Sequence, residues 1–120
     1  MSREMEQGRM AEDMALVYLL NRGFVLKERN WRVEHKEIDL IMESENYIHV
    51  IEVKSLKAPA QLSPFEHVDK KKQNNIVGAA RKYIFQQRVT KELQFDIVSV
   101  LFYRSRVELD YIENAFFPIY

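Results

Sequence analysis

Two apolar stretches with interleaved charges stand out in the sequence: Glu37-Ile38-Asp39-Leu40-Ile41 and Val50-Ile51-Glu52-Val53-Lys54. Side chains alternate between the two faces of a β-strand, so Asp39 lies on one face while Ile38 and Leu40 lie on the other. The residues between the stretches are mostly polar, which is typical of a turn. The pattern therefore predicts an antiparallel hairpin with one apolar face.

The apolar face also sets the register of this hairpin, since a slip of one residue would scramble both faces. The predicted pairs are Ile38 with Val53, Leu40 with Ile51, Asp39 with Glu52, and Glu37 with Lys54. Two carboxylates directly opposite each other destabilise a sheet, so the pair of Asp39 and Glu52 requires a compensating positive charge. A divalent cation would provide it, and so would ordinary surface salt bridges. The apolar run before Glu52 favours the cation, because it indicates a strand buried on both faces.

The rest of the chain predicts the element order α-β-β-β-α-β-β. Apolar residues at helical spacing indicate a helix over 5–22, ended by Gly23, and a second helix from the cap Ser63-Pro64 to about Gln87, with room for a break near Asp69. The expected strands are 24–31, 34–42, 47–54, 95–102 and 107–112, with a loop over 55–63. We expect an α/β fold with a mixed central sheet flanked by helices, forming a single domain over residues 1–120.

Composition excludes several classes of protein. The chain has 120 residues and no cysteine, which rules out a disulfide scaffold, thiolate metal sites and a cysteine nucleophile. No apolar run is long enough to span a bilayer and the first residues are polar, so we expect a cytoplasmic protein with no membrane contact. Eighteen basic and 18 acidic residues give a net charge of zero, which argues against a uniformly basic nucleic-acid-binding surface. A local basic groove is still possible, since one group of basic residues lies between the end of the hairpin and the second helix: Lys54, Lys57, Lys70, Lys71, Lys72, Arg81 and Lys82.

A helix carboxylate, an Asp on one strand and Glu-x-Lys on the next together resemble the PD-(D/E)xK nuclease superfamily. More closely, the chain resembles the small bacterial YraN-like family, which is itself similar to Holliday-junction resolvases. The matching segments follow one another through nearly the whole chain: Ala11-Glu12-Asp13-Met14-Ala15, Arg22-Gly23-Phe24, Arg29-Asn30-Trp31-Arg32, 37–41, 51–54, Val68, Lys72-Gln73, Ala79-Ala80, Phe95-Asp96-Ile97-Val98 and Asn114-Ala115-Phe116. The resemblance implies a restriction-endonuclease-like fold with an αβββαβ core.

The implied activity is Mg²⁺- or Mn²⁺-dependent cleavage of phosphodiester bonds in DNA, with branched, Holliday-junction-like DNA as a candidate substrate. By position, the resemblance implies that Asp39 and Glu52 hold the metal, helped by the backbone carbonyl of Val53 and by Glu12. Lys54 would orient the attacking water or stabilise negative charge on the phosphate. Resolvase-like relatives also suggest a homodimer, because symmetric cleavage of a four-way junction needs two active sites.

Further residues are expected around this site. Lys72 and Gln73 match polar positions at the start of the second helix and extend its apolar stripe. We expect nucleic-acid contacts from Lys72, Gln73, Lys70, Lys71 and Lys57. Glu37 lies on the same strand face as Asp39, where a supporting ion pair with Lys54 is favoured over direct metal binding.

Two other functions stay open. A non-catalytic module that binds nucleic acid or a protein on a nuclease fold is favoured by Leu56 and Gln94, which stand where the family commonly has basic residues. The third reading is a structural α/β domain whose acidic hairpin is only solvated surface. The histidines His35, His49 and His67 are scattered, which favours surface or packing roles over a catalytic triad or a metal site. Trp31 is expected to pack in the fold and not to stack on a base.

Overall fold

The structure, a computed structural model, describes residues 2–58 and 68–117. Its elements are α1 (Arg3–Asn21), β1 (Val25–Val33), β2 (Lys36–Glu43), β3 (Tyr47–Lys57), α3 (Lys70–Gln87), β4 (Glu92–Phe102) and β5 (Val107–Phe116). The predicted order of helices and strands is confirmed. The proposed cap at 63–64 lies outside the described residues, and α3 begins after Asp69, whose side chain accepts a hydrogen bond from the Lys72 N–H.

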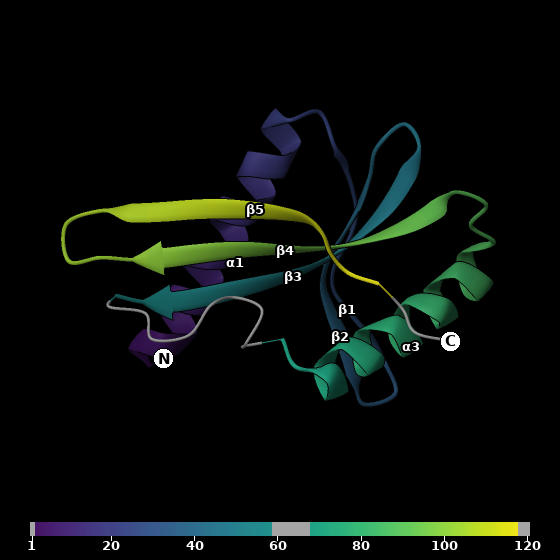
Figure 1. Cartoon of the computed structure of the whole chain (residues 1–120), viewed down its shortest axis with the longest axis horizontal. Coiled ribbons are helices and arrows are strands. Elements are labelled where there is room, and N and C mark those ends of the chain that lie inside the picture. Colours follow the sequence, from purple (N-terminus) through teal and green to yellow (C-terminus); the bar gives the residue numbers. More distant parts are fainter. Residues whose placement is uncertain (1, 59–67, 118–120) are drawn as a thin grey trace.

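The strands of the described part of the chain form one mixed sheet in the order β1-β2-β3-β4-β5. Among them, β3 and β4 are parallel, because α3 carries the chain across between them, and the other neighbouring strands are antiparallel. This is the predicted α/β architecture, and it is consistent with a restriction-endonuclease-like fold. In Figure 1, β3, β4 and β5 extend to the left with α1 behind them, while β1 and β2 run down from the centre towards α3.

Each helix covers a different apolar surface of the sheet. On α1, Ala11, Ala15 and Leu19 recur every fourth residue and are fully buried against a cluster that includes Leu40 and Ile51. On α3, the buried residues belong to a second cluster: Ile76, Val77, Ala79, Ala80 and Tyr83. Trp31 packs into this second cluster with its ring edge-on to Tyr83, at 5.3 Å between centroids, so its expected packing role is confirmed.

Strand β3 continues further than the sequence predicts. The expected loop from residue 55 is wrong at its start, because β3 stays paired with β4 as far as Lys57 opposite Phe102. The end of α1 is as predicted: Gly23 adopts a φ of 93° after the helix, and its N–H donates to the carbonyl of Leu20.

The predicted hairpin register is correct where β2 and β3 pair. Leu40 lies opposite Ile51, and the ladder continues from there towards the turn. It does not extend to Ile38 and Val53, so the expected continuous face is wrong at that end. There the side chain of Asp39 accepts a hydrogen bond from the Val53 N–H. Ile38, which β3 does not pair, packs in the cluster under α3.

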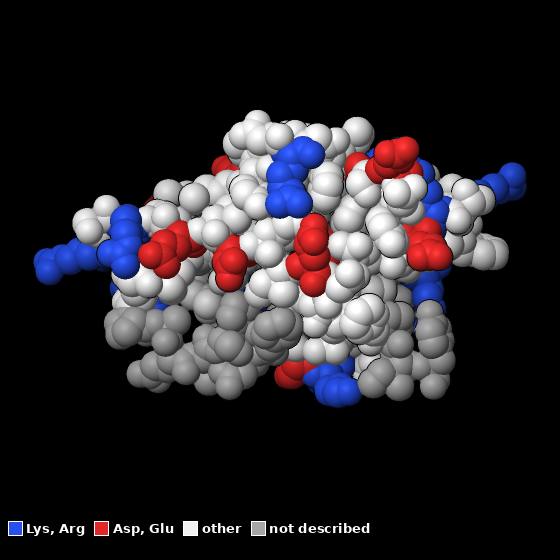
Figure 2. All heavy atoms as spheres, turned by 45° about the horizontal axis from the view of Figure 1, so that its top comes forward, with Lys and Arg blue, Asp and Glu red and all other residues white. Residues whose placement is uncertain are grey.

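Charged side chains are scattered over one face of the molecule. On this face, shown in Figure 2, acidic and basic groups are interspersed and no continuous basic area forms. None of the helices in the described part of the chain carries an apolar stretch long enough to cross a membrane.

Candidate active site

The candidate site lies where the pairing of β2 and β3 ends. Here Asp39 Oδ2 accepts a hydrogen bond of 2.8 Å from the Val53 N–H, which fixes the carboxyl group beside β3. The side chains of Asp39 and Glu52 are themselves in hydrogen-bonding contact. Glu52 is only 4% exposed, so the predicted pair of carboxyl groups does form, and it is buried.

Two carboxyl groups in a buried contact cannot both ionise freely. Burial, followed by the charge of Glu52, raises the pKa of Asp39 to about 8. The charge of Glu12 adds to this increase, so the α1 carboxylate is close enough to influence the pair. At neutral pH and without a bound cation, the Asp39 carboxyl group is therefore protonated, which removes one of the two negative charges.

Two lysines approach Glu52 from different elements. Lys72 Nζ, from the first turn of α3, lies 3.0 Å from Glu52 Oε1, and Lys54 Nζ, from β3, lies 3.6 Å from the same oxygen. Burial lowers the pKa of Lys54, and its neighbour Lys72 lowers it further, although Glu52 opposes the shift. Burial also acts to lower the pKa of Lys72, but the charge of Glu52, whose Oε1 lies 3.0 Å from Lys72 Nζ, raises it overall. The two cations are therefore unlike: the proton is held more weakly on Lys54.

Glu12 is close to this site but is held by another residue. Its Oε1 lies 3.3 Å from Arg29 Nε, while the same guanidinium binds Asp13 Oδ1 at 2.7 Å. Within residues 2–58 and 68–117, no group of three or more His, Cys, Asp or Glu side chains is arranged to hold a metal ion. The structure thus brings the carboxyl groups of Asp39 and Glu52 together, and it places Glu12 nearby in an ion pair with Arg29.

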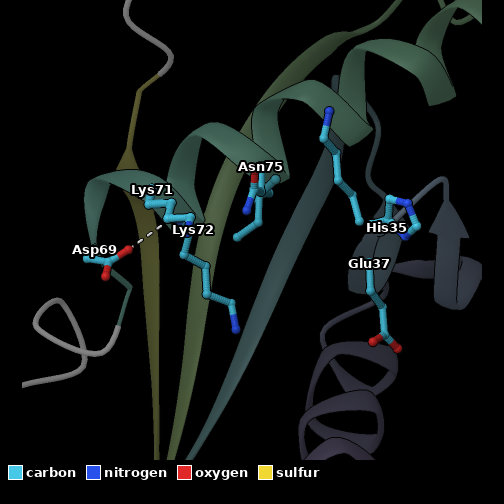
Figure 3. A pocket seen from close by; sticks show the side chains of 8 residues that line it. His35, Glu37, Asp69, Lys71, Lys72 and Asn75 are labelled. Atoms are coloured by element: carbon cyan, nitrogen blue, oxygen red, sulfur yellow. Dashed lines mark hydrogen bonds between the residues drawn. The ribbon is translucent and has the colours of Figure 1, made fainter.

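A hollow of about 360 Å³ opens next to Lys72, between the start of α3 and the β1–β2 turn. Figure 3 shows Asp69, Lys71, Lys72 and Asn75 on the α3 side and His35 and Glu37 on the strand side. Lys70 and Lys71 are exposed in the first turn of α3, and Lys57 is exposed at the end of β3. All three lysines are accessible to a polyanion, as a role in DNA contact requires.

One expected contact differs in the structure, and one residue expected at the DNA has a contact within the protein. Glu37 forms its ion pair with Arg32, at 3.7 Å, and not with Lys54, because the β2–β3 pairing that would have placed it opposite Lys54 has already ended. Gln73 donates its side-chain N–H to the carbonyl of Val68 at 2.9 Å, so it fastens the chain leading into α3.

The sequence profile of the "Uncharacterised protein family UPF0102" matches residues 11–100. This chain belongs to the UPF0102 family. It is 35% identical to a UPF0102 protein of Parabacteroides distasonis, covering 98% of this chain and 97% of the relative. It is 32% identical to one of Bacteroides thetaiotaomicron, covering 98% of each, and 36% identical to one of Dictyoglomus thermophilum, covering 92% of this chain and 97% of the relative.

In this UPF0102 protein, the matched range contains the whole candidate site, from Glu12 to Lys72. Sequence reasoning missed that Lys72 binds Glu52 directly, although its position on the apolar stripe of α3 already indicated that it faces inward. It also missed that Arg29 holds Glu12. The sequence did carry a signal for Arg29, because this residue lies in the segment 29–32, one of the segments on which the resemblance to YraN-like proteins rests.

His49 has the packing contacts that the sequence predicts and further hydrogen bonds that it does not. Its expected packing role is confirmed, since its ring stacks on Phe24 at 4.5 Å between centroids and is 3% exposed. The histidine is also hydrogen-bonded on both sides, to Ser44 and to Asp96. Sequence analysis did not predict the bond between His49 and Asp96, because 47 residues separate them along the chain and no local pattern connects them.

Proposed function

We propose that this protein is a divalent-metal-dependent endonuclease that hydrolyses phosphodiester bonds in DNA. The observation that carries this proposal is the buried contact between Asp39 and Glu52, with Lys54 and Lys72 both on Glu52. A buried pair of carboxylates is costly unless a cation or a proton compensates it. A site that keeps such a pair next to two lysines is therefore suited to a cation and a phosphate.

The donor set fits Mg²⁺ or Mn²⁺. Mg²⁺ is typically held by one or two protein carboxylates, together with waters and phosphate oxygens of the substrate. Asp39 and Glu52 would supply the carboxylates, with the Val53 carbonyl and Glu12 as further candidate ligands. When bound, the ion would lower the pKa of a coordinated water and stabilise charge on the phosphate.

The lysines have separate tasks in this proposal. Lys54 is partly buried, and burial lowers its pKa, so its Nζ can exchange a proton with an attacking water more readily than an ordinary lysine. Lys72 stays charged and balances Glu52 before the substrate arrives. Once a phosphate enters, the same Nζ can bind its oxygens, because Lys72 is 43% exposed.

We place the DNA along the start of α3. Lys70 and Lys71 are exposed there, beside the hollow that Lys72 lines, while Lys57 is exposed at the end of β3. A net charge of zero implies few phosphate contacts, so binding should be moderate and selective for local DNA structure. Branched DNA is the substrate we propose, cut by a homodimer that presents one site to each of two strands.

A second function has one observation in its favour. Glu12 is bound to Arg29, so the third carboxylate of the site is directed towards a guanidinium. This arrangement also suits a non-catalytic module that binds nucleic acid or a protein partner. Such a module should bind DNA equally well after Asp39→Asn or Glu52→Gln, whereas the endonuclease should lose cleavage.

A cleavage panel tests the proposal. Purified protein is incubated with four-way junction, flap, single-stranded and duplex DNA, each with Mg²⁺, Mn²⁺ or EDTA. We expect metal-dependent cleavage that Glu52→Ala and Lys54→Ala abolish. Glu108→Gln, an exposed strand carboxylate that pairs with Arg106, is the matched control and should cleave like the wild type. Absence of cleavage of every substrate with either metal would refute the enzyme.

A further inference from the structure

A second hydrogen-bonded array lies at the β2–β3 turn, and the proposed nuclease chemistry does not use it. Ser44 Oγ lies 2.7 Å from Nε2 of His49, and Nδ1 of the same ring lies 2.9 Å from Oδ2 of Asp96. Ser44 precedes the turn, while His49 is in β3 and Asp96 is in β4. The array therefore joins three separate segments, in the order nucleophile, base and carboxylate.

The partners of Asp96 determine the direction of these hydrogen bonds. Besides His49, the carboxylate accepts from the Tyr111 hydroxyl at 2.6 Å, and from Gln94 Nε2 and the Asn114 N–H at 3.0 Å each. With these donors around it and an exposure of 0%, Asp96 acts as an acceptor, so Nδ1 of His49 carries the hydrogen. In the neutral ring, the lone pair then lies on Nε2 and faces the hydroxyl of Ser44.

The imidazole is also fixed in orientation. Phe24 stacks on it at 4.5 Å and Tyr47 meets it edge-on at 5.9 Å, both measured between ring centroids. In this arrangement, one imidazole nitrogen is hydrogen-bonded to a carboxylate and the other faces a hydroxyl group. Such an imidazole can act as the base that activates a serine nucleophile.

The serine is accessible through a cavity. A cavity of about 370 Å³ is lined by Ser44 and His49, together with Arg22, Phe24 and Asn46. A volume of this size accommodates a small organic molecule. Arg22 also lines this cavity, where its guanidinium donates hydrogen bonds to the Tyr18 hydroxyl and to Glu113.

We propose that Ser44 is a nucleophile that His49 activates, and that the cavity accepts a small carboxylic ester. Ser44 Oγ attacks the carbonyl carbon while its proton passes to Nε2 of His49. The C–O bond to the alcohol breaks, and the alcohol oxygen takes this proton as it leaves. Water, deprotonated by the same nitrogen, then attacks the acyl group, which releases the carboxylic acid and returns the proton to Ser44.

The test is covalent labelling of the full-length protein with an alkyl fluorophosphonate in EDTA, where the proposed nuclease is inactive. We expect one adduct at Ser44, located by peptide mass spectrometry, and none in Ser44→Ala. His49→Phe keeps an aromatic ring against Phe24 and should slow labelling about 100-fold or more, since a general base contributes that much. Ser105→Ala, at an exposed turn serine, is the matched control and should label like the wild type.

The result that overturns the proposal is the absence of an adduct at Ser44 in the wild type, or equal labelling of Ser44 and Ser105. An unchanged rate in His49→Phe that is folded by circular dichroism overturns it as well. In either case the array would only brace the turn. If His49→Phe does not fold, the site of the wild-type adduct decides, because that measurement needs no variant at His49.

Discussion

Replacing Asp39 with asparagine should stabilise the metal-free protein. In the wild type, the carboxyl groups of Asp39 and Glu52 are in contact and buried, and this raises the pKa of Asp39 to about 8. Asparagine keeps an oxygen that can accept the hydrogen bond from the Val53 N–H. Its amide can also donate to the Glu52 carboxylate, as the protonated Asp39 carboxyl group does at neutral pH, but without the cost of taking up a proton.

The magnitude follows from proton linkage. The pKa of Asp39 rises from 3.8, its ordinary value, to about 8 in the folded protein, so the folded state keeps a proton that the unfolded state releases. The stabilisation of the folded state by the proton on Asp39 is complete below pH 4, decreases as pH rises towards 8, and is absent above pH 8. The free energy of unfolding changes by up to about 1.4 kcal/mol per pH unit in this range. Local relaxation reduces the total, so we expect Asp39→Asn to raise the free energy of unfolding by about 1–3 kcal/mol at pH 7.5, since replacing buried charged groups by neutral ones yields gains of this size. For a chain of this size, that raises Tm by roughly 5–10 °C.

Urea unfolding in EDTA at pH 5, 7 and 9 measures the effect. The advantage of Asp39→Asn over the wild type should grow between pH 5 and pH 9, while Asp110→Asn, at an exposed strand position, should show little change. Added Mn²⁺ should then stabilise the wild type and not Asp39→Asn, because a ligand stabilises only the state that binds it. A variant that is less stable than the wild type at pH 7–9, or a difference that does not grow with pH, would contradict a raised pKa of Asp39.

Three further substitutions test separate parts of the account. Lys54→Met should lower the rate of DNA cleavage about 100-fold or more, because a lysine that transfers a proton contributes to the rate. The Mn²⁺ affinity, measured by calorimetry, should change little, because Lys54 is not a metal ligand. A large loss of Mn²⁺ affinity would contradict this. Leu40→Ala should cost about 2–5 kcal/mol in urea unfolding, because Leu40 is fully buried under α1, and a cost below 1 kcal/mol would show that the site collapses easily. Asp69→Ala should cost about 0.5–2 kcal/mol through loss of the α3 cap, and an unchanged midpoint would speak against that cap.

The order of helices and strands could be predicted because it depends on local patterns. Alternation along 37–41 and 50–54 predicted the hairpin, and matching of apolar faces placed Leu40 opposite Ile51. The same rule failed at Ile38, because it assumes that a ladder continues as long as the pattern does. Here a side chain of β2, Asp39, bonds to the backbone of β3 where the ladder ends.

The contacts of the site depend on residues far apart in the chain. The approach of Asp39 to Glu52 followed from register, but the approach of Lys72 required knowing how α3 crosses the sheet. The bond between Arg29 and Glu12 joins β1 to α1, and no periodicity within either element specifies it. Long-range polar contacts of this kind depend on tertiary packing, so a single sequence does not contain a local signal for them.

Calorimetric titration of Mn²⁺ into the wild type and into Glu52→Gln measures whether Asp39 and Glu52 together hold a divalent cation. We expect a saturable site in the wild type that is lost in Glu52→Gln and retained in the control Glu108→Gln. Binding heat that is absent from the wild type, or that is the same in all three proteins, would contradict it.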